Sequence, residues 1–368
     1  MIDTRLEKLA TILGRYSLGL KKNDLFVISG SHLAAPLIKE VYYQAVKIGA
    51  HPFTHIGIDG LAEIYYQHAS EQQLKYVSPL SKFETEQIDA SLSIISPENT
   101  RNMTNIDPKK QAISSAANHQ IYETFLRRAA KKELRWCITQ YPTQASAQDA
   151  EMSLVDYEDF IFDAAHVHAK DPIKYWKTVQ SDQEKIRTFL NKKKNLHVIA
   201  KGTDLRISVT GRKWINCSGK ENFPDGEVFT GPVETSAEGR ISYSFPGSYN
   251  GREVNDIQLW FEKGNVVKAT ASKGESFLHT MLAMDPGAKR LGEFAFGTNY
   301  GVKSYTKNTL FDEKIGGTIH LAVGSGYPET GSKNKSSLHW DMVCDLRKNG
   351  EVSADDELIY KNGRFLNL

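Results

Sequence analysis

The chain has 368 residues, of which 40% are hydrophobic, and this length predicts two domains. Its 46 Lys and Arg residues against 44 Asp and Glu residues leave a formal charge of +2, which gives no electrostatic reason to expect nucleic acid or an anionic membrane as a partner. The N-terminal segment lacks an apolar signal-peptide core, no apolar run approaches the ~20 residues that span a bilayer, and three scattered cysteines suit a reducing compartment. We therefore expect a soluble, cytoplasmic protein.

The first half of the chain alternates strand and helix patterns. Pro36 in the first turn and Gly49 after the last residue mark the ends of a helix at 35–48. Strands separated by helices of this length are typical of crossover units, so we expect an α/β N-terminal domain with a mainly parallel sheet over residues 1–194. Strands are expected at 24–29, 51–57, 90–96 and 135–140, and further helices around 108–132, 156–169 and 172–190.

The pattern changes after about Asn195. Glycine becomes frequent, the expected strands are short, and Lys263-Gly264-Asn265 lies between two strand-like runs as a hairpin turn would. We therefore expect residues 195–368 to form a β-rich α+β domain that binds metal and carries catalysis.

Five side chains of types that bind metals occur in strand-like or turn-rich segments of this second half. Two carboxylates directly follow glycines, where other backbone can approach closely. Judged singly, such a glutamate is more often a surface residue, and a histidine in an apolar run is more often a hydrogen-bonded core residue. The five candidates are Glu227, Glu293, His320, His339 and Asp341.

The spacing of His339 and Asp341 is the most informative feature of this set. Residues 337–344 have a strand pattern, and residues two apart on a strand point to the same face, whereas on a helix they would diverge. An imidazole and a carboxylate would therefore be presented together. A single His-x-Asp is usually a hydrogen-bonded histidine beside an exposed aspartate. The prediction of a metal site therefore depends on all five candidate residues together.

The set as a whole predicts two metal ions. Carboxylates and imidazoles without thiolates suit Zn²⁺, Co²⁺ or Mn²⁺. Five ligands exceed what one catalytic zinc with an open position needs, and they suit two ions that share a bridging carboxylate and a bridging water. The residues leave open which carboxylate bridges and which metal is native.

Motifs in consistent order along nearly the whole chain resemble the thermophilic-type metallo-aminopeptidase family, which includes aminopeptidase T and aminopeptidase S. In the first half these are Pro142-Thr143 and the segment to Ser153. In the second half they are Thr203–Leu205, Gly211-Arg212, Pro224–Thr230, Gly292-Glu293, Gly297–Asn299, Leu310–Lys314, Gly317–His320, Gly324–Tyr327 and His339–Asp341.

The resemblance implies a function and roles for particular residues. It implies that the five candidates are metal ligands, with Glu293 acting in catalysis as well, and that Tyr327 is a catalytic residue whose phenol could donate a hydrogen bond to the developing oxyanion. It further implies a homodimer that hydrolyses the first peptide bond of peptides with a free N-terminus. Without the resemblance, Tyr327 would be interpreted as a packing residue on a loop.

Two other functions remain open from the residues. A two-metal phosphoesterase would use similar ligands, but such sites usually add basic side chains, and the ligand segments have no Arg or Lys next to a ligand in sequence. A non-catalytic peptide-binding relative would not need two metals. Asp225, Glu234 and Glu329 are all possible general bases, and spacing does not choose among them.

Two further patterns resemble ligand-binding motifs but fail in detail. Gly326–Lys333 contains glycines and a lysine, but the lysine does not stand between the second glycine and a Ser/Thr as a phosphate loop requires. His166 and His168 fall in a predicted helix, where residues two apart do not share a face, so we expect surface residues.

Overall fold

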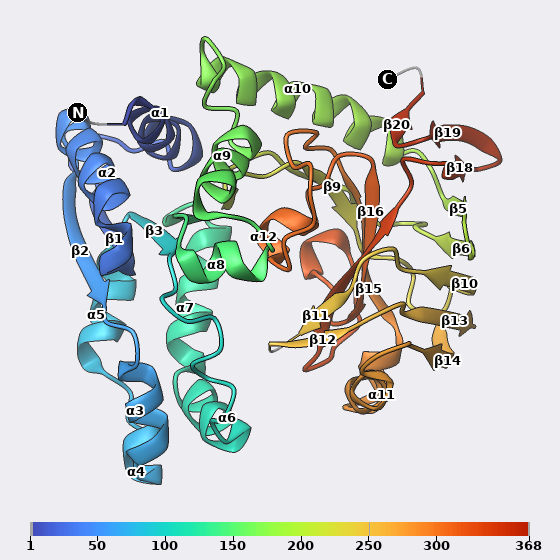
Figure 1. Ribbon diagram of the computed structural model, residues 1–368, viewed down its shortest axis with the longest axis horizontal. Coiled ribbons are helices and arrows are strands. Elements are labelled where there is room, and N and C mark those ends of the chain that lie inside the picture. The colour runs from blue at the N-terminus through green and yellow to red at the C-terminus, as the bar shows by residue number, and fades with distance from the viewer. Residues whose placement is uncertain (1–2, 250, 367–368) are drawn as a thin grey trace. The chain divides into compact units, whose positions relative to one another are not determined.

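The computed structural model describes residues 3–249 and 251–366 (Figure 1). The chain forms two compact units. The first comprises Met1–Ile173 and Gly219–Phe223, and the second comprises Lys174–Ser218 and Pro224–Leu368. The division therefore falls near the start of helix α10 (Pro172–Leu190). The domain limits expected from the sequence, 1–194 and 195–368, stay a prediction.

The first unit is built on a five-stranded sheet of order β2-β1-β3-β4-β8, in which every neighbouring pair runs parallel. This confirms the predicted parallel sheet and its first four strands. The short fifth strand, which the later part of the chain contributes, was not predicted. The bounds are β1 Leu25–Ser31, β2 His51–Gly57, β3 Ala90–Ile95, β4 Arg135–Gln140 and β8 Asn222–Phe223.

The helices of the first unit follow the predicted pattern with two corrections. The helix α2 spans the predicted residues and ends where Gly49 adopts a φ of 92°, a conformation that glycine tolerates. The predicted helix at 108–132 is two helices, because Asn118 leaves the helical conformation between them. The helix predicted at 156–169 ends at Ala164, and His166 has a φ of 51°, which a right-handed helix excludes.

The bounds of these helices are α1 Thr4–Ile12, continued by a π-helical turn at Leu13–Ser17, α2 Ala35–Ile48, α3 Leu61–His68, α4 Glu71–Leu74, α5 Pro79–Gln87, α6 Pro108–Ala117, α7 His119–Ala130, α8 Gln144–Asp149 and α9 Leu154–Ala164.

The second unit contains two larger antiparallel sheets and one small one, which confirms the predicted β-rich character. The eight-stranded sheet has the order β14-β13-β10-β6-β5-β18-β19-β20, and the five-stranded sheet has the order β17-β16-β15-β9-β7. The predicted hairpin is β13 and β14, and its turn residues Lys263 and Gly264 both have positive φ, as a tight hairpin turn requires. No helix among the described residues has the length and apolar character needed to cross a membrane.

The strands of the eight-stranded sheet are β5 Asn195–Ala200, β6 Thr203–Ser208, β10 Glu238–Ser242, β13 Gln258–Glu262, β14 Asn265–Thr270, β18 Glu351–Ala354, β19 Glu357–Lys361 and β20 Arg364–Phe365. The remaining elements are β7 Ile215–Cys217, β9 Glu227–Thr230, β11 Gly247–Tyr249, β12 Arg252–Val254, β15 Leu291–Gly297, β16 Thr318–Gly324, β17 His339–Asp345, α11 Glu275–Leu282 and α12 Thr309–Asp312.

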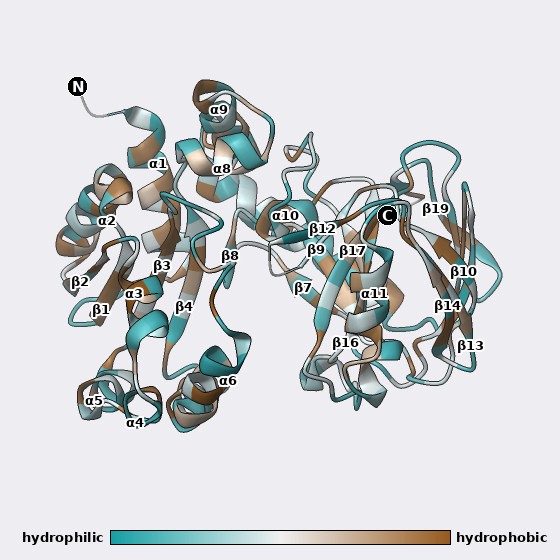
Figure 2. Cartoon of the chain, turned by 60° about the horizontal axis from the view of Figure 1, so that its bottom comes forward, coloured by the Kyte–Doolittle hydropathy of each residue, from teal (hydrophilic) through white to brown (hydrophobic). Residues whose placement is uncertain are grey.

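Both larger sheets pack into one hydrophobic core, which orients the side chains of the five-stranded sheet. Hydrophobic residues, brown in Figure 2, lie along the strands of this unit. The core takes Ile319, Leu321 and Val323 from β16, and it takes Trp340 and Met342 from β17. Because side chains alternate along a strand, the intervening residues of β16 and β17 point to the opposite face of the sheet. The candidate ligands lie on that opposite face.

Candidate metal centre

Three neighbouring strands place small residues between the candidate ligands. In the ladder Ala322 lies directly between Glu293 of β15 and Asp341 of β17, and His320 lies next to Ala295. An alanine fills little of the space above the sheet, so the longer side chains around it converge over a common hollow. A register shift in β15 between Leu291 and Glu293 sets this alignment.

The structure brings all five predicted ligands together in two groups that share one residue. Glu227, Glu293 and His320 form one group, and Glu293, His339 and Asp341 form the other, with the ligand atoms of each group within 4.8 Å of one another. The Nε2 atom of His320 lies 3.4 Å from Glu293 Oε1, and that of His339 lies 3.5 Å from Glu293 Oε2. The two oxygens of one carboxylate thus face different groups.

The two histidines are held in the orientation that a metal ligand needs. The Nδ1 atom of His320 lies 3.1 Å from the backbone carbonyl of Glu313, and that of His339 lies 2.8 Å from the carbonyl of Ser325. A carbonyl oxygen can only accept, so each ring keeps its hydrogen on Nδ1 and directs Nε2 toward the carboxylates. Nε2 is then available to a cation.

The glycines before two of the ligands are explained by close packing of the backbone. A Cβ atom on Gly226, whose φ is 130°, would lie 2.7 Å from Asn299 Cβ. A Cβ atom on Gly292 would lie 2.2 Å from the carbonyl oxygen of Ser325. Both contacts exclude larger residues, so these two glycines let other backbone approach next to Glu227 and Glu293, as the sequence predicted.

The electrostatics of the site favour a bound cation. Burial opposes the charged imidazolium, but the surrounding carboxylates outweigh it and raise the pKa of His320 to about 9 and that of His339 to about 10. Burial, with the charge of Asp341, raises the pKa of Glu293. Among the described residues, Glu227 Oε2 and Asp341 Oδ1 are buried and accept no hydrogen bond. Crowded carboxylates with spare lone pairs fit divalent metal ions.

Two adjacent residues, Glu313 and Lys314, complete the site and were given no role from the sequence. The Lys314 ammonium is 1% exposed and lies 2.8 Å from both Glu227 Oε1 and Glu313 Oε2. Burial opposes its charge, but these carboxylates outweigh that effect and raise the pKa of Lys314. The only sequence signal for the pair was its place in the segment 310–314, which was noted for the family resemblance.

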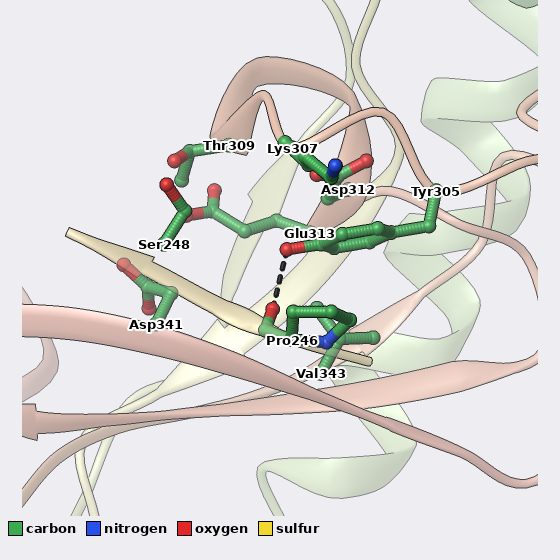
Figure 3. A pocket seen from close by; sticks show the side chains of 9 residues that line it. All are labelled: Pro246, Ser248, Tyr305, Lys307, Thr309, Asp312, Glu313, Asp341 and Val343. Atoms are coloured by element: carbon green, nitrogen blue, oxygen red, sulfur yellow. Dashed lines mark hydrogen bonds between the residues drawn. The ribbon is translucent and has the colours of Figure 1, made fainter. Parts of the chain in front are cut away.

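Glu313 lies in a pocket together with one of the candidate ligands. Figure 3 shows Glu313 and Asp341 lining this pocket, with Tyr305 donating a hydrogen bond to the Pro246 carbonyl at its wall. Burial raises the pKa of Glu313 to about 8 even though Lys314 opposes the shift. The side chain therefore has the placement and the proton affinity of an acid–base group at the edge of the cluster.

Tyr327 lies beside the candidate ligands on the segment between β16 and β17. Its ring contacts Phe229 and His339 edge-on, with centroid distances of 5.3 and 5.2 Å. The residue is 40% exposed, so it can meet a substrate from solvent. Burial of the phenol group and the charge of Glu293 raise its pKa, so the hydroxyl stays a hydrogen-bond donor.

The general bases considered from the sequence are engaged or lie elsewhere. Glu234 pairs with Arg212 at 2.5 Å, Glu329 is exposed on a 3-10 turn, and Asp225 is buried and accepts from the N–H of Gly226. Glu313, which was given no role from the sequence, lines the pocket next to Asp341.

The rejected histidine pair lies outside the cluster, and the segment rejected as a phosphate loop carries Tyr327 beside it. His168 pairs with Asp163 at 3.7 Å and is exposed. The segment 326–333 has inward-pointing polar side chains that bind its own backbone, as Thr330 does by donating to the Tyr327 carbonyl. No Arg or Lys is next to a candidate ligand in the sequence, but the fold brings the Lys314 ammonium into contact with Glu227. Since this ammonium is buried between two carboxylates, it is not offered to a phosphate.

Comparisons with known proteins connect nearly the whole chain to one family. A sequence profile of the family described as Thermophilic metalloprotease (M29) matches residues 2–365. The chain is 28% identical to Aminopeptidase 2 of Geobacillus stearothermophilus over 91% of this chain and 87% of that protein, and 27% identical to Aminopeptidase AmpS of Bacillus subtilis over 98% of both. The structure of wild-type AmpT from Thermus thermophilus superposes with a TM-score of 0.85 at 25% identity, covering 98% of this chain and 99% of that one.

Proposed function

The chain belongs to the thermophilic metalloprotease family (M29) and is an aminopeptidase of that family, and from this premise we propose that it hydrolyses the first peptide bond of peptides with two divalent ions. The observation that carries the proposal is the position of Glu293. Its two carboxylate oxygens face His320 and His339, at 3.4 and 3.5 Å, so one side chain belongs to both ligand groups. This is the arrangement that a bridging carboxylate needs.

Each ion would have its own terminal ligands in addition to the bridge. Glu227 and His320 would complete one site, and His339 and Asp341 would complete the other. When bound, two such ions lower the pKa of a shared water and polarise the scissile carbonyl. Carboxylate and imidazole donors without thiolate suit Zn²⁺, Co²⁺ or Mn²⁺.

The remaining steps are carried by side chains at the rim of the cluster. Glu313 would take the proton from the attacking water and later give it to the leaving amine. Tyr327 would donate its phenolic hydrogen to the oxygen that becomes negative, because its raised pKa keeps it protonated. Glu293 would act in catalysis through its place between the two groups.

Negative and positive charges nearly balance in the complete site. Because the hydroxide would form only when Glu313 takes the proton of the water, the three ligand carboxylates and either ionised Glu313 or that hydroxide would supply four negative charges. Two divalent ions and Lys314 would supply five positive charges, which leaves a net charge of +1. Such near-balance lowers the cost of burying these charges.

Peptides with a free N-terminus are the proposed substrates. The pocket beside the cluster is lined by three carboxylates, those of Asp312, Glu313 and Asp341. The carboxylates that line it would attract an α-ammonium group. We further propose a homodimer in the cytoplasm without nucleic-acid or membrane partners, in line with the family resemblance and the near-neutral charge of +2.

The proposal is tested by removing and restoring metal. Protein dialysed against chelator should not cleave Leu-, Ala- or Arg-anilides, and Zn²⁺, Co²⁺ or Mn²⁺ should restore cleavage of the free but not the N-acetylated substrates. His339→Ala should not recover under any of these metals. Cleavage of the acetylated anilides would contradict the exopeptidase assignment, and cleavage of p-nitrophenyl phosphate alone would favour the phosphoesterase alternative.

A further inference from the structure

The residues 325–338, here called the tyrosine loop, connect β16 to β17 and carry Tyr327. Polar side chains alternate along its middle: Thr330, Ser332 and Asn334 are buried, while Lys333 and its other neighbours are exposed. A buried polar side chain is stable only if it is hydrogen-bonded, so the inward residues show where the loop is fastened to the rest of the unit.

The base of the loop is fastened by Asn334. Its side-chain amide donates to the carbonyls of Gly287, at 2.9 Å, and Gly324, at 2.5 Å. The backbone N–H of Gly326 in turn donates to the Asn334 carbonyl at 3.1 Å. These contacts hold the two ends of the loop together but do not reach its tip.

The tip of the loop, at Ser332 and Lys333, is fastened by a partly buried ion pair from outside the loop. Glu234 Oε1 accepts from the backbone N–H of Lys333 at 2.6 Å and lies 3.4 Å from Ser332 Oγ. Its other oxygen lies 2.5 Å from a guanidinium nitrogen of Arg212, and the two side chains are only 15% and 7% exposed. Burial opposes ionisation, but the Lys333 N–H and Arg212 outweigh it and lower the pKa of Glu234. The carboxylate is therefore an ionised acceptor with one oxygen for each partner.

The segment that carries Arg212 is also connected to Tyr327 by hydrogen bonds. The backbone N–H of Lys213, which follows Arg212, donates to the Thr330 carbonyl at 2.9 Å. The Thr330 hydroxyl donates to the carbonyl of Tyr327 at 2.6 Å, and it accepts from the N–H of Ser332 at 3.2 Å. A chain of hydrogen bonds therefore leads from the ion pair to the backbone of Tyr327.

The packing leaves this arrangement little freedom. A Cβ atom on Gly326, the residue before Tyr327, would lie 2.0 Å from the hydroxyl oxygen of Ser332. A Cβ atom on Gly231 would lie 2.7 Å from Ser332 Cβ. Ser332 is thus enclosed by two glycines and held at Glu234, so a shift of the loop tip would move Tyr327 as well.

We propose that the Arg212–Glu234 ion pair positions Tyr327 over the metal centre by holding the tip of the tyrosine loop. The inference rests on the proposed catalytic role of Tyr327. Arg212 and Glu234 are positioning residues, because the side-chain hydrogen bonds that the described residues show for them go to the loop and to each other rather than to the five candidate ligands. Their removal should lower turnover and leave metal binding intact.

The experiment is a double-mutant cycle on the metal-reconstituted full chain. Glu234→Ala should lower kcat on Leu-anilide by about 10- to 100-fold with little change in KM, because a misplaced catalytic group lowers the rate without weakening binding. In a Tyr327→Phe background the same change should lower kcat less than about twofold, since residues that act through one another are not additive. Glu234→Gln, which keeps an acceptor for the Lys333 N–H, should recover part of the rate.

Several controls keep the outcome interpretable. If Glu234→Ala folds poorly, the double variant Arg212→Met/Glu234→Ala replaces it. This double variant removes both charges and leaves no unpaired guanidinium in the protein, and we expect it to lower kcat as Glu234→Ala does. Glu262→Ala changes an exposed glutamate of β13 and should leave kcat unchanged. Isothermal titration with Zn²⁺ should give the same stoichiometry for all variants.

Different failures of the cycle have different meanings. An equal loss of kcat in both backgrounds would overturn the positioning role, as would wild-type kcat in Glu234→Ala. Full activity in Tyr327→Phe would instead contradict the proposed role of the tyrosine in the reaction. Loss of Zn²⁺ binding in Glu234→Ala would show that the pair supports the ligands rather than the loop.

Discussion

The strands and the tyrosine loop hold the two parts of the candidate site in different ways. Glu227, Glu293 and His320 lie on strands whose backbones are paired on both sides, and they are at most 5% exposed. Tyr327 lies outside any strand, is 40% exposed, and depends on side-chain contacts to fix its backbone. Metal binding should therefore be a property of the sheet, whereas turnover should depend on the loop as well. Variants in each region can separate the two.

The largest effect is expected when the shared ligand is changed. Glu293→Gln removes a negative charge that both ligand groups use, so both ions should bind much more weakly. Since residues that merely orient a ligand contribute about 10–100-fold in affinity, we expect a loss beyond 100-fold and no measurable anilide cleavage. Equilibrium dialysis with metal analysis checks this, with Glu262→Gln as the matched exposed control. Retention of two ions at wild-type affinity would rule out the bridging role.

A second variant tests whether the stability of the carboxylates on the sheet depends on the buried Lys314 ammonium. Lys314→Met leaves Glu227 and Glu313 without the ammonium that lies 2.8 Å from each. Removing one partner of a buried ion pair costs about 3–5 kcal/mol, so the free energy of unfolding in chelator should fall by that amount. Urea denaturation of the variant and of Lys289→Met, an exposed lysine, gives the comparison. Equal stability of the two would show that the carboxylates are compensated in another way.

The loop is tested by removing one hydroxyl. Tyr327→Phe should lower kcat by about 10²–10³-fold, the usual loss when an oxyanion donor is removed. Zn²⁺ affinity should stay at the wild-type value, because the phenol is not among the ligands. Steady-state kinetics with titration calorimetry measures both quantities, and Tyr76→Phe, an exposed tyrosine of the first unit, serves as control. A parallel loss of metal binding would remove the distinction between strands and loop.

Local sequence patterns predicted much of the fold, because apolar periodicity and helix-terminating residues depend on interactions between residues close in the sequence. The alternation of helix and strand in the first half gave four of the five parallel strands, and the limits of α2 followed from Pro36 and Gly49. The strand β8 was missed because two residues carry no period and their pairing is decided by tertiary contacts. The break at Asn118 and the turn at His166 are also local conformations that an apolar pattern does not report.

The sequence predicted those parts of the site that depend on residue type and on spacing along one strand. His339 and Asp341 share a face of β17 as their spacing requires, so the pair was readable from the sequence. The place of Glu293 between the two groups depends on the strand order β17-β16-β15 and on the register shift in β15, which spacing along the chain does not contain. Lys314 and Glu313 were missed for the same reason, since only the fold brings them to Glu227 and Asp341.

The variant with the smallest expected effect changes Asp312. This buried carboxylate lies beside the site and is not one of the five candidate metal ligands. Its Oδ1 accepts from the N–H and the hydroxyl of Thr306, at 2.7 and 2.9 Å, yet burial outweighs these bonds and raises its pKa from 3.8 to about 7. The folded protein therefore holds this proton between about pH 4 and 7 while the unfolded chain releases it. The stability that this proton contributes is complete below about pH 4 and is lost as the pH rises through 7.

Asp312→Asn should remove this dependence, because an amide keeps an acceptor for Thr306 and does not ionise. The free energy of unfolding of the wild type should fall relative to the variant by about 2 kcal/mol between pH 5 and pH 7. Urea denaturation of both proteins in chelator at several pH values measures the difference, which cancels titrations that the two proteins share. A constant difference across the range would mean that Asp312 stays ionised in the fold. The pocket next to Glu313 would then be more polar than its burial indicates.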